Sequence, residues 1–453
     1  MTMATTVVKE TAFDAFKDQW DRVVRARLRE AEWLTAQRET AWKRFEEHGL
    51  PHPRLEAWRK TPIRAITAQA WQMADTMLDV LTKADLAPFQ IPGTAAEYVL
   101  VDGRYRPDLS TVKGLPQGVR VNGMAAAARD APDRLARILG TAATFEKPEA
   151  AFTALNTAMW NDGIVLEMGK GSRLEAPIHI LSLRTASKAP RAAYPRILLN
   201  LGEGAEATVV ESHGQIGKDG APTLTVACTE TFLGTGARLD HVRIQRERLD
   251  ASHHATVAAR LASNATLRQF SFSEGAALAR FDIAAILGVE GVEAHLDGVF
   301  LAAGEQLVDH HTFIDHAAPR GTSHEVYKGI VTGKSHGIFY GAVLVRPKAA
   351  KTASREENRN LVLSRTAKVD STPQLEIHND DVKCGHGSTI GALDPLALHY
   401  MRARGIGKDD ARRILTQAFA AQALDRVRSE PVRKHLHARF EAWFEAHKTE
   451  ADR

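Results

Sequence analysis

The pattern of hydrophobic and polar positions changes twice along the 453-residue chain. Helical spacing dominates the first part, short alternating segments typical of strands follow, and helical spacing returns at the end. We therefore expect three domains. These are a helical and mixed N-terminal domain over 1–162, a strand-rich core over 163–391, and a helical C-terminal domain over 392–453.

The first domain begins with helices. Between residues 9 and 48 apolar side chains recur at steps of three and four, and Pro51 and Pro53 stop the run. Further on, EYVLVDGRYRP predicts a strand and a turn, and MAAAARDAPDRLARILG predicts a helix interrupted at Pro132. An aromatic stripe at helical spacing is typical of a core, so we assign no ligand to this region.

The core domain repeats one sequence pattern, which consists of a strand end, a turn of small residues and another strand. Most steps between copies are about 30 residues and one is near half that, a spacing typical of a stacked solenoid. Strands with short turns favour a right-handed parallel β-helix, and the regular spacing weighs against a β-sandwich. The expected fold is thus mainly β, flanked by helical domains. The copies begin at Leu166, Leu201, Leu233, Leu261, Leu287, Leu301, Val331 and Leu363.

The last domain is punctuated by residues that start and stop helices. Asp394 is a good N-cap, and Pro395 suits the first helical position. Breaks follow at Gly405 and Gly407 and again at Pro431. Arginines on these helices form either a solvated face or a docking face for a partner; they are Arg402, Arg404, Arg412, Arg413, Arg426, Arg428 and Arg433.

Composition narrows the function classes. A formal charge of +4 with interleaved signs does not indicate a nucleic-acid partner. The two cysteines, Cys228 and Cys384, exclude a disulfide scaffold and fit a reducing compartment. No apolar run approaches the roughly 20 residues that span a bilayer, and the first residues lack the apolar core of a signal peptide. We expect a cytoplasmic protein that binds neither nucleic acid nor membrane.

The stretch from Ser371 to Leu398 gathers the clearest candidate chemistry. Cys384 can supply a thiolate and His386 a neutral imidazole, the side chains that bind borderline and soft metals. His378 and the acidic Glu376, Asp380 and Asp381 lie in the same stretch. Cys-x-His offers two ligands where a closed tetrahedral site needs four, so the alternative is a polar loop with a buried thiol.

Other candidates are weaker. Cys228 lies among alternating apolar residues, and this pattern predicts a small core residue rather than a metal ligand. The segment from Gly329 to Ser335 resembles a phosphate-binding loop, but it has three residues between its glycines where that motif has four, and a strand pattern follows it. We therefore expect no nucleotide here. Histidines that could line neighbouring coils are His253, His254, His295, His310, His311, His316, His324 and His336.

The run LEIHNDDVKCGHGSTIGALD, followed by LALHYMRARGIGKDDARRILTQAFA, resembles the C-terminal signature of the SufB/SufD family of iron–sulfur assembly proteins. DDVKCGHGSTIG is more similar to the SufD members than to the SufB members. Weaker similarity extends over most of the chain, through RLEAWRKTPI, AFTALNTAMWNDGI, VDHHTFIDHAAP and HEVYKGIVTGKSHGIFYGAVLV.

The resemblance implies a β-helix core and a non-catalytic scaffold subunit. It implies that His386 and Cys384 contribute to a transient iron–sulfur cluster shared with a SufB-like partner. It also implies that the helices after Asp394 dock a SufC-like ABC-type ATPase, and that ATP hydrolysis belongs to that partner. A homodimer in isolation is a further expectation.

Two hypotheses from other functional classes remain open. β-Helices often carry carbohydrate-active enzymes, for which Asp282, Asp309, Asp315 and Arg320 are candidates. The histidine group could instead make a stand-alone metalloprotein.

Overall fold

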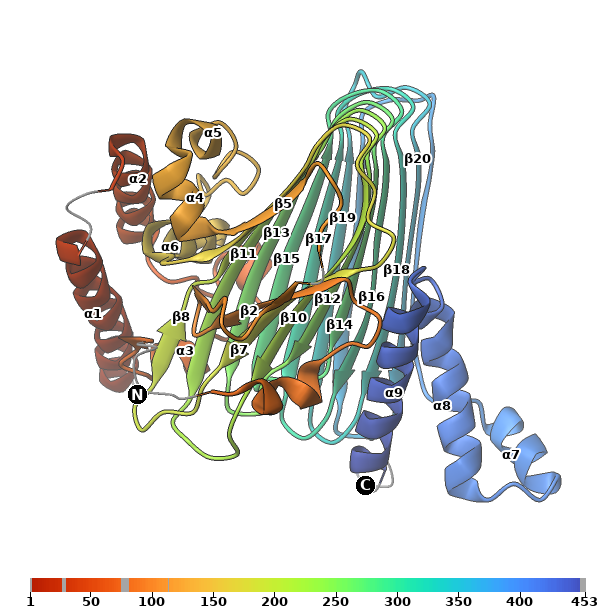
Figure 1. Cartoon of the computed structure of the whole chain (residues 1–453). Helices are drawn as coiled ribbons and strands as arrows, with labels where there is room; N and C mark the ends of the chain where they lie inside the picture. The colour runs from red at the N-terminus through yellow and green to blue at the C-terminus, as the bar shows by residue number, and fades with distance from the viewer. Residues whose placement is uncertain (1, 27–29, 75–80, 113, 449–453) are drawn as a thin grey trace.

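The computed structural model describes residues 2–26, 30–74, 81–112 and 114–448. Two eleven-stranded sheets, here sheet A and sheet B, form most of the molecule and face each other across a narrow interior (Figure 1). The chain alternates between them, and neighbouring long strands within each sheet are parallel. The expected mainly β fold with a parallel β-solenoid is confirmed.

The strands of sheet A, starting from the last coil, are β21 (Lys368–Ile377), β19 (His336–Val345), β17 (Leu307–His316), β15 (Leu278–Leu287), β13 (Ser252–Leu261), β11 (Thr223–Leu233), β9 (Arg196–Leu201), β6 (Gly163–Met168) and β5 (Val119–Gly123), with β8 (Arg191–Ala193) beside β11 and β1 (Gln72–Met73) beside β8. Those of sheet B are β22 (Lys383–Gly391), β20 (Ala353–Val362), β18 (Thr322–Val331), β16 (Glu293–Ala302), β14 (Thr266–Ser273), β12 (Arg238–Arg246), β10 (Glu206–Gln215), β7 (Ile178–Arg184), β2 (Ala96–Val101) and β3 (Arg104–Tyr105), with β4 (Thr111–Val112) beside β2.

The register of the strands explains the repeat seen in the sequence. Leu307 of β17 pairs with His336 of β19, and His336 pairs with Lys368 of β21, so the chain returns to the same sheet after about 30 residues. The short step between the copies at Leu287 and Leu301 has a simple cause. Leu287 ends β15 in sheet A and Leu301 lies at the end of β16 in sheet B, so this step spans half a coil.

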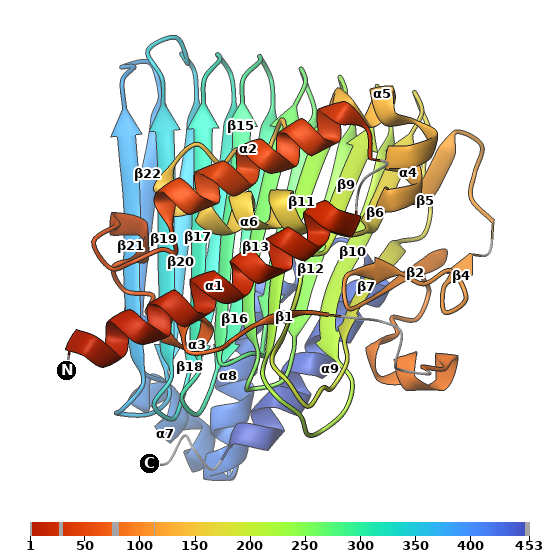
Figure 2. The ribbon, with the colours of Figure 1, turned by 90° about the vertical axis from the view of Figure 1, so that its left-hand side faces the viewer.

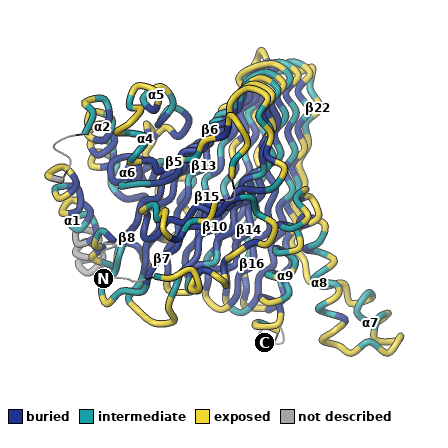
Figure 3. The backbone as a smooth tube through the Cα atoms, viewed as in Figure 1, coloured by how far each residue is buried: buried dark blue, intermediate teal, exposed yellow. Residues whose placement is uncertain are grey.

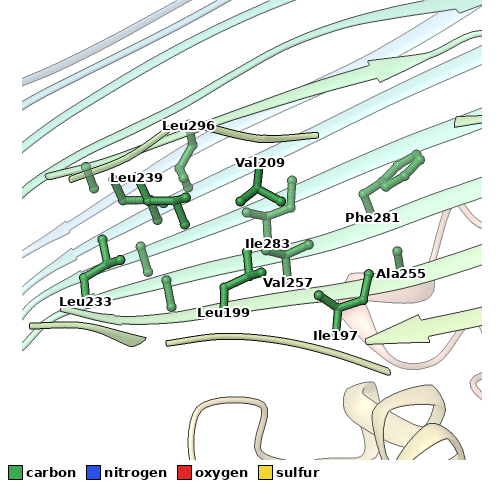
Figure 4. Packing of buried hydrophobic residues seen from close by; sticks show 14 of the residues in the cluster. Ile197, Leu199, Val209, Leu233, Leu239, Ala255, Val257, Phe281, Ile283 and Leu296 are labelled. Atoms are coloured by element: carbon green, nitrogen blue, oxygen red, sulfur yellow. The ribbon is translucent and has the colours of Figure 1, made fainter. Parts of the chain in front are cut away.

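The interior between the sheets is apolar along much of its length. Alternate residues of each strand point inward. Ile197 and Leu199 of β9 and Ile283 of β15 meet Val209 of β10 and Leu239 of β12 in one buried cluster (Figure 4). Each coil therefore buries its inward side chains against its neighbours in the stack.

Helices cover the outer faces of both sheets. They are α1 (Thr2–Ala26), α2 (Glu32–His48), α3 (Arg64–Thr67), α4 (Met124–Asp130), α5 (Pro132–Ala136), α6 (Ala151–Met159), α7 (Pro395–Ala403), α8 (Lys408–Leu424) and α9 (Glu430–His447). The first helices and α6 lie over sheet A (Figure 2), whereas α8 and α9 pack on sheet B through a cluster that includes Phe270, Leu301 and Phe440. The middle strands are consequently buried on both faces.

The predicted helices are found where the pattern placed them. Within the range 9–48, the residues up to Ala26 lie in α1 and those from Glu32 onward form α2; residues 27–29 lie outside the described residues. Pro132 begins α5, and Asp394 caps α7 by accepting a hydrogen bond from the Leu396 amide at 2.9 Å. Helix α6 was not predicted as a helix, because all nine of its residues are buried and it has no polar face. In the described part of the chain, no helix is long and apolar enough to cross a membrane.

The last coil of the solenoid stands apart from the rest. Residues of β21 and β22 are mostly half-buried or exposed, whereas those of the middle strands are mostly buried (Figure 3). Helix α7 extends away from the strands and packs against α8 (Figure 1).

Candidate functional site

The two predicted ligands lie on the same face of β22, the final strand. Cys384 and His386 are two residues apart, so both point toward sheet A, about 7 Å apart along the strand. Ser388 confirms the direction of this face, because its Oγ donates a hydrogen bond to Ser371 Oγ of β21 at 2.7 Å. Cys384 and His386 therefore lie at the open end of the interior, in register with Ser354 and Glu356 of β20.

The Cys384 thiol is half-buried and packs against the apolar interior. Burial raises its pKa above the ordinary value, and a backbone hydrogen bond with Ser354 only partly offsets that effect. The free thiol therefore stays protonated at neutral pH. A bound metal or a positive charge from another chain would be needed to form the thiolate.

His386 is exposed, and it lines a hollow of about 550 Å³ at the edge of β22. Glu356 lines the same hollow, and Glu325 of β18 is the register partner of Glu356 on its other side. The sequence analysis did not single out these two glutamates. Most of β20 alternates polar residues with other polar residues, and the apolar residues of β18 lie on both of its faces, so no apolar signal shows which face turns inward.

The remaining residues of the predicted stretch do not join Cys384 and His386. His378 Nε2 lies 2.8 Å from Glu376 Oε1, and both side chains are exposed. Asp380 and Asp381 lie in the turn between β21 and β22. The cluster suggested by sequence proximity thus reduces to one cysteine and one histidine.

The histidine group is distributed over different surroundings. His253 and His310 point into the interior, where His253 bonds Glu247 at 2.6 Å and His310 bonds Ser273 at 3.2 Å. Three of the remaining histidines pair with a carboxylate: His254 with Asp282, His311 with Asp309, and His336 with Asp370. His316 forms a hydrogen bond with Ser323, and the His295 ring stacks on the His324 ring. Among the described residues, no three His, Cys, Asp or Glu side chains are already gathered for a metal ion.

Cys228 is fully buried on β11, beside Ala142, Ala143 and Ala258. Burial raises the pKa of its thiol to about 12. Its expected place as a small core residue is confirmed, although it lies between sheet A and an N-terminal segment rather than inside the solenoid. The segment from Gly329 to Ser335 comprises the end of β18 and the turn before β19, so a strand follows it, as expected.

The carboxylates considered for a carbohydrate-active enzyme are held in ion pairs. Arg280 bridges Asp282 and Asp309, and Arg346 binds Asp315 at 2.6 Å. Although burial opposes ionisation, Arg280 and His254 hold the pKa of Asp282 well below its usual range. Asp309 is fully buried and Arg320 pairs with Glu290. These groups do not form an open catalytic row.

A second exposed surface lies on the C-terminal helices. Leu396 and Tyr400 of α7 are 76% and 57% exposed, and Ile414 of α8 is partly exposed. Arg404 lies over the Tyr400 ring at 4.2 Å. Of the predicted arginine face, Arg426 pairs with Asp297 of β16 and so holds α8 against sheet B.

The fold and the site together define a class of protein, namely a parallel β-solenoid whose candidate metal ligands lie at an open end of the solenoid rather than in a closed pocket. Comparison with known families is consistent with this class. The SufBD core domain of SUF-system iron–sulfur cluster assembly matches residues 183–419, and the SufBD N-terminal region matches residues 9–180. The chain belongs to the SufB/SufD family and has a role in iron–sulfur cluster assembly.

Individual relatives cover most of the chain. It is 31% identical to an iron–sulfur cluster assembly SufBD family protein of Synechocystis, over 83% of this chain and 84% of that protein. It is 28% identical to the iron–sulfur cluster assembly protein SufD of Escherichia coli, over 86% and 88%. It is 27% identical to the chloroplastic protein ABCI7 of Arabidopsis thaliana, over 87% and 81%.

Proposed function

We propose that this chain is a SufD-like, non-catalytic scaffold subunit of a SufB–SufC–SufD complex. It contributes Cys384 and His386 to a transient iron–sulfur cluster shared with a SufB-like subunit. The observation that carries the proposal is the open last coil, which presents both ligands on an uncovered strand. Its cysteine usage fits a reducing compartment, for which we propose the cytoplasm.

The last coil is suited to pairing with another chain. Within the described residues, β21 pairs with β19 and β22 with β20, so each leaves one backbone edge without a strand partner. Ile377 and Ile390 are 41% and 51% exposed at this end. Exposed edges with apolar side chains favour the addition of further strands. A SufB-like subunit is the proposed partner, and the same edge would support a homodimer in isolation.

Cys384 and His386 make half of a ligand set. A four-coordinate iron or zinc centre needs two more ligands, which the partner would supply. Binding there would also change the Cys384 environment, because a nearby cation favours the thiolate over the thiol.

We further propose that α7 and the exposed side of α8 dock a SufC-like ABC-type ATPase. Leu396, Tyr400 and Ile414 provide apolar contacts, and neighbouring arginines provide charge. ATP hydrolysis in that partner would move α7 and α8 and thereby alter the contact between the two solenoids.

The ligand proposal is tested by His386→Ala in the co-expressed complex. We expect the three subunits to co-purify while maturation of a reporter iron–sulfur protein is lost. His378→Ala is the matched control, because His378 directly follows β21, eight positions before His386, but pairs with Glu376. Normal maturation in the His386→Ala complex would contradict the assigned role.

The docking proposal needs surface variants rather than a deletion after Ala392. Such a deletion would remove α8 and α9 and expose the apolar outer face of sheet B. The double variant Leu396→Glu with Tyr400→Glu should retain the SufB-like subunit and lose the ATPase in a pull-down. Leu249→Glu changes another exposed leucine, 61% exposed on the β12–β13 turn, and should keep both partners. Retention of the ATPase by the α7 variant would refute this docking face.

A further inference from the structure

Two glutamates lie inside the solenoid one and two coils behind His386. Glu356 of β20 is in register with His386, and Glu325 of β18 is in register with Glu356. Adjacent parallel strands are about 4.8 Å apart, so the two carboxylates are close neighbours. Both residues are almost completely buried, with 1% and 2% of Glu325 and Glu356 exposed.

These carboxylates lack compensation by the protein. Within the described part of the chain, none of their four oxygens has a hydrogen-bond partner. Burial, and for Glu325 also the charge of Glu356, raises both pKa values, that of Glu356 to about 8. A buried carboxylate pair without donors is costly, so an occupant with positive charge would stabilise it.

The opposite wall is shaped around the pair. Gly341 of β19 faces Glu356, since a Cβ placed there would lie 2.2 Å from Glu356 Oε1. Thr312 of β17 occupies the same inward row one coil earlier and is the register partner of Gly341. This residue is buried, and its interaction with the Glu325 carboxylate opposes the rise in the Glu325 pKa. Thr312 therefore adds a fifth buried oxygen beside the four of the carboxylate pair.

The pair lies close to the open end. Glu356 and His386 both line a hollow of about 550 Å³ at the end of the solenoid, and only the last strand, β22, separates the buried Glu356 carboxylate from that end. By contrast, the other interior carboxylates are already neutralised. Glu211 pairs with Arg243 and two histidines, and Glu247 pairs with His253.

We propose that Glu325 and Glu356 bind one divalent cation inside the solenoid, through their carboxylate oxygens and the Thr312 hydroxyl. Oxygen ligands of this kind suit Mg²⁺, Mn²⁺ and Fe²⁺. The three side chains leave coordination positions for water, which a site reached from an open end can supply. Such an ion would lie one coil inside the residues proposed as cluster ligands, in a position to be handed outward to them.

The site is independent of those cluster ligands and of any partner, so the purified chain alone tests it. Mn²⁺ is titrated into the chain, and the free ion is counted by electron paramagnetic resonance. We expect about one bound Mn²⁺ per chain and at least about a tenfold weaker affinity in Glu356→Gln and in Glu325→Gln. An anaerobic competition with Fe²⁺ or Mg²⁺ then ranks the ions at the same site.

Glu357→Gln is the matched control. Glu357 is the next residue on β20, points to the opposite face and pairs with Arg359 at 2.7 Å, so Mn²⁺ affinity should not change. Equal Mn²⁺ binding by the wild-type chain and Glu356→Gln, or no binding at millimolar Mn²⁺, would overturn the proposal. Glutamine removes charge without shortening the side chain, and a thermal melt without metal verifies that each variant is folded. Cation binding in a chain whose His386→Ala complex matures clusters normally would preserve this site and reject only the cluster role.

Discussion

The middle and the last coil of the solenoid are built from strands of about the same length, yet their surroundings differ. Val257 of β13 and Ile283 of β15 are packed by coils on both sides and lie under helices that cover the outer faces. Ile377 and Ile390 occupy the corresponding inward positions of β21 and β22, but in the part of the chain that the structure describes no further coil covers them. Each coil is stabilised mainly by its neighbours, so the same inward pattern gives a core in one place and an accessible surface in the other.

The interior itself changes along this axis. The inward row is apolar around Leu199 and Leu239, and polar groups farther along it, such as Glu211, are held in ion pairs. Near the end it holds Glu325 and Glu356, whose carboxylates form no ion pair among the described residues. Polar interior groups are costly when unpartnered and are therefore informative about function. The difference separates a part of the molecule that maintains the fold from a part that is available for binding.

The largest expected loss of stability comes from a substitution in the middle coils of the solenoid, which are covered by helices. Arg196 and Glu230 form a fully buried ion pair, and Glu230 also accepts hydrogen bonds from the Gly140, Ala142 and Ala143 amides. Arg196→Ala leaves the Glu230 charge buried without its cation and should lower the free energy of unfolding by about 3–5 kcal/mol. Urea denaturation measures the change. Lys170→Ala, which breaks the exposed pair with Glu203, should cost at most about 1 kcal/mol. Similar losses in both variants would contradict the comparison.

A pair of isoleucines compares the two coils directly. Ile283→Ala creates a cavity in the interior and should cost about 2–5 kcal/mol of unfolding free energy. Ile390→Ala removes the same atoms from a side chain that is half exposed, and it should cost about 0.5 kcal/mol or less in the isolated chain. Both values come from denaturant titrations at one temperature. Equal costs would show that the last coil is as well packed as the middle.

Acid should weaken the covered part through its buried histidines. Burial lowers the pKa of His310 to about 3, although Asp309 favours the charged form. The unfolded chain therefore takes up the proton near pH 6.5 while the folded chain does not. The stability present above pH 6.5 is lost as the pH falls toward 3, at about 1.4 kcal/mol per pH unit.

His310→Gln tests this effect. The difference in unfolding free energy between pH 7 and pH 5 should shrink by about 2 kcal/mol relative to the wild-type chain. The exposed His378 is the control, and His378→Gln should leave the difference unchanged. An unchanged pH dependence in His310→Gln would show that other groups cause the acid sensitivity.

The substitution expected to change folding stability least is one that should clearly change association between chains. Ile390→Lys places a charge on the exposed end and should change the free energy of unfolding by about 0.5 kcal/mol or less. If the isolated chain forms a homodimer through β21 and β22, sedimentation velocity should show that this variant is monomeric. Leu249→Lys, on a distant turn, should leave the oligomeric state unchanged. A dimer that persists in Ile390→Lys would place its interface elsewhere.

Much of the architecture could be predicted from local patterns. The repeat of about 30 residues followed from small turn residues at regular intervals, and the N-cap at Asp394 and the helix start at Pro132 act through adjacent backbone groups. Helix α6 was missed because it is buried on all sides, which removes the periodic signal. The assignment of Cys228 as a small buried residue was right for the reason given, since its neighbours alternate in polarity.

The candidate site was only half predictable. Cys384 and His386 stood out by chemistry and by resemblance, and a spacing of two on a strand already places them on one face. Glu325 and Glu356 are 31 positions apart, and only the register of β18 with β20 makes them neighbours. Within β20, inward and outward residues are both polar, so alternation could not distinguish the two faces.

The sequence by itself determined the kinds of element, their order and the period of the coil, because turns, caps and apolar spacing act over a few residues. The tertiary structure decided which residues share the interior, which histidines are held by carboxylates, and that the last coil is left uncovered. These outcomes depend on contacts between residues a full coil or more apart, whose registration is set by stacking the whole solenoid.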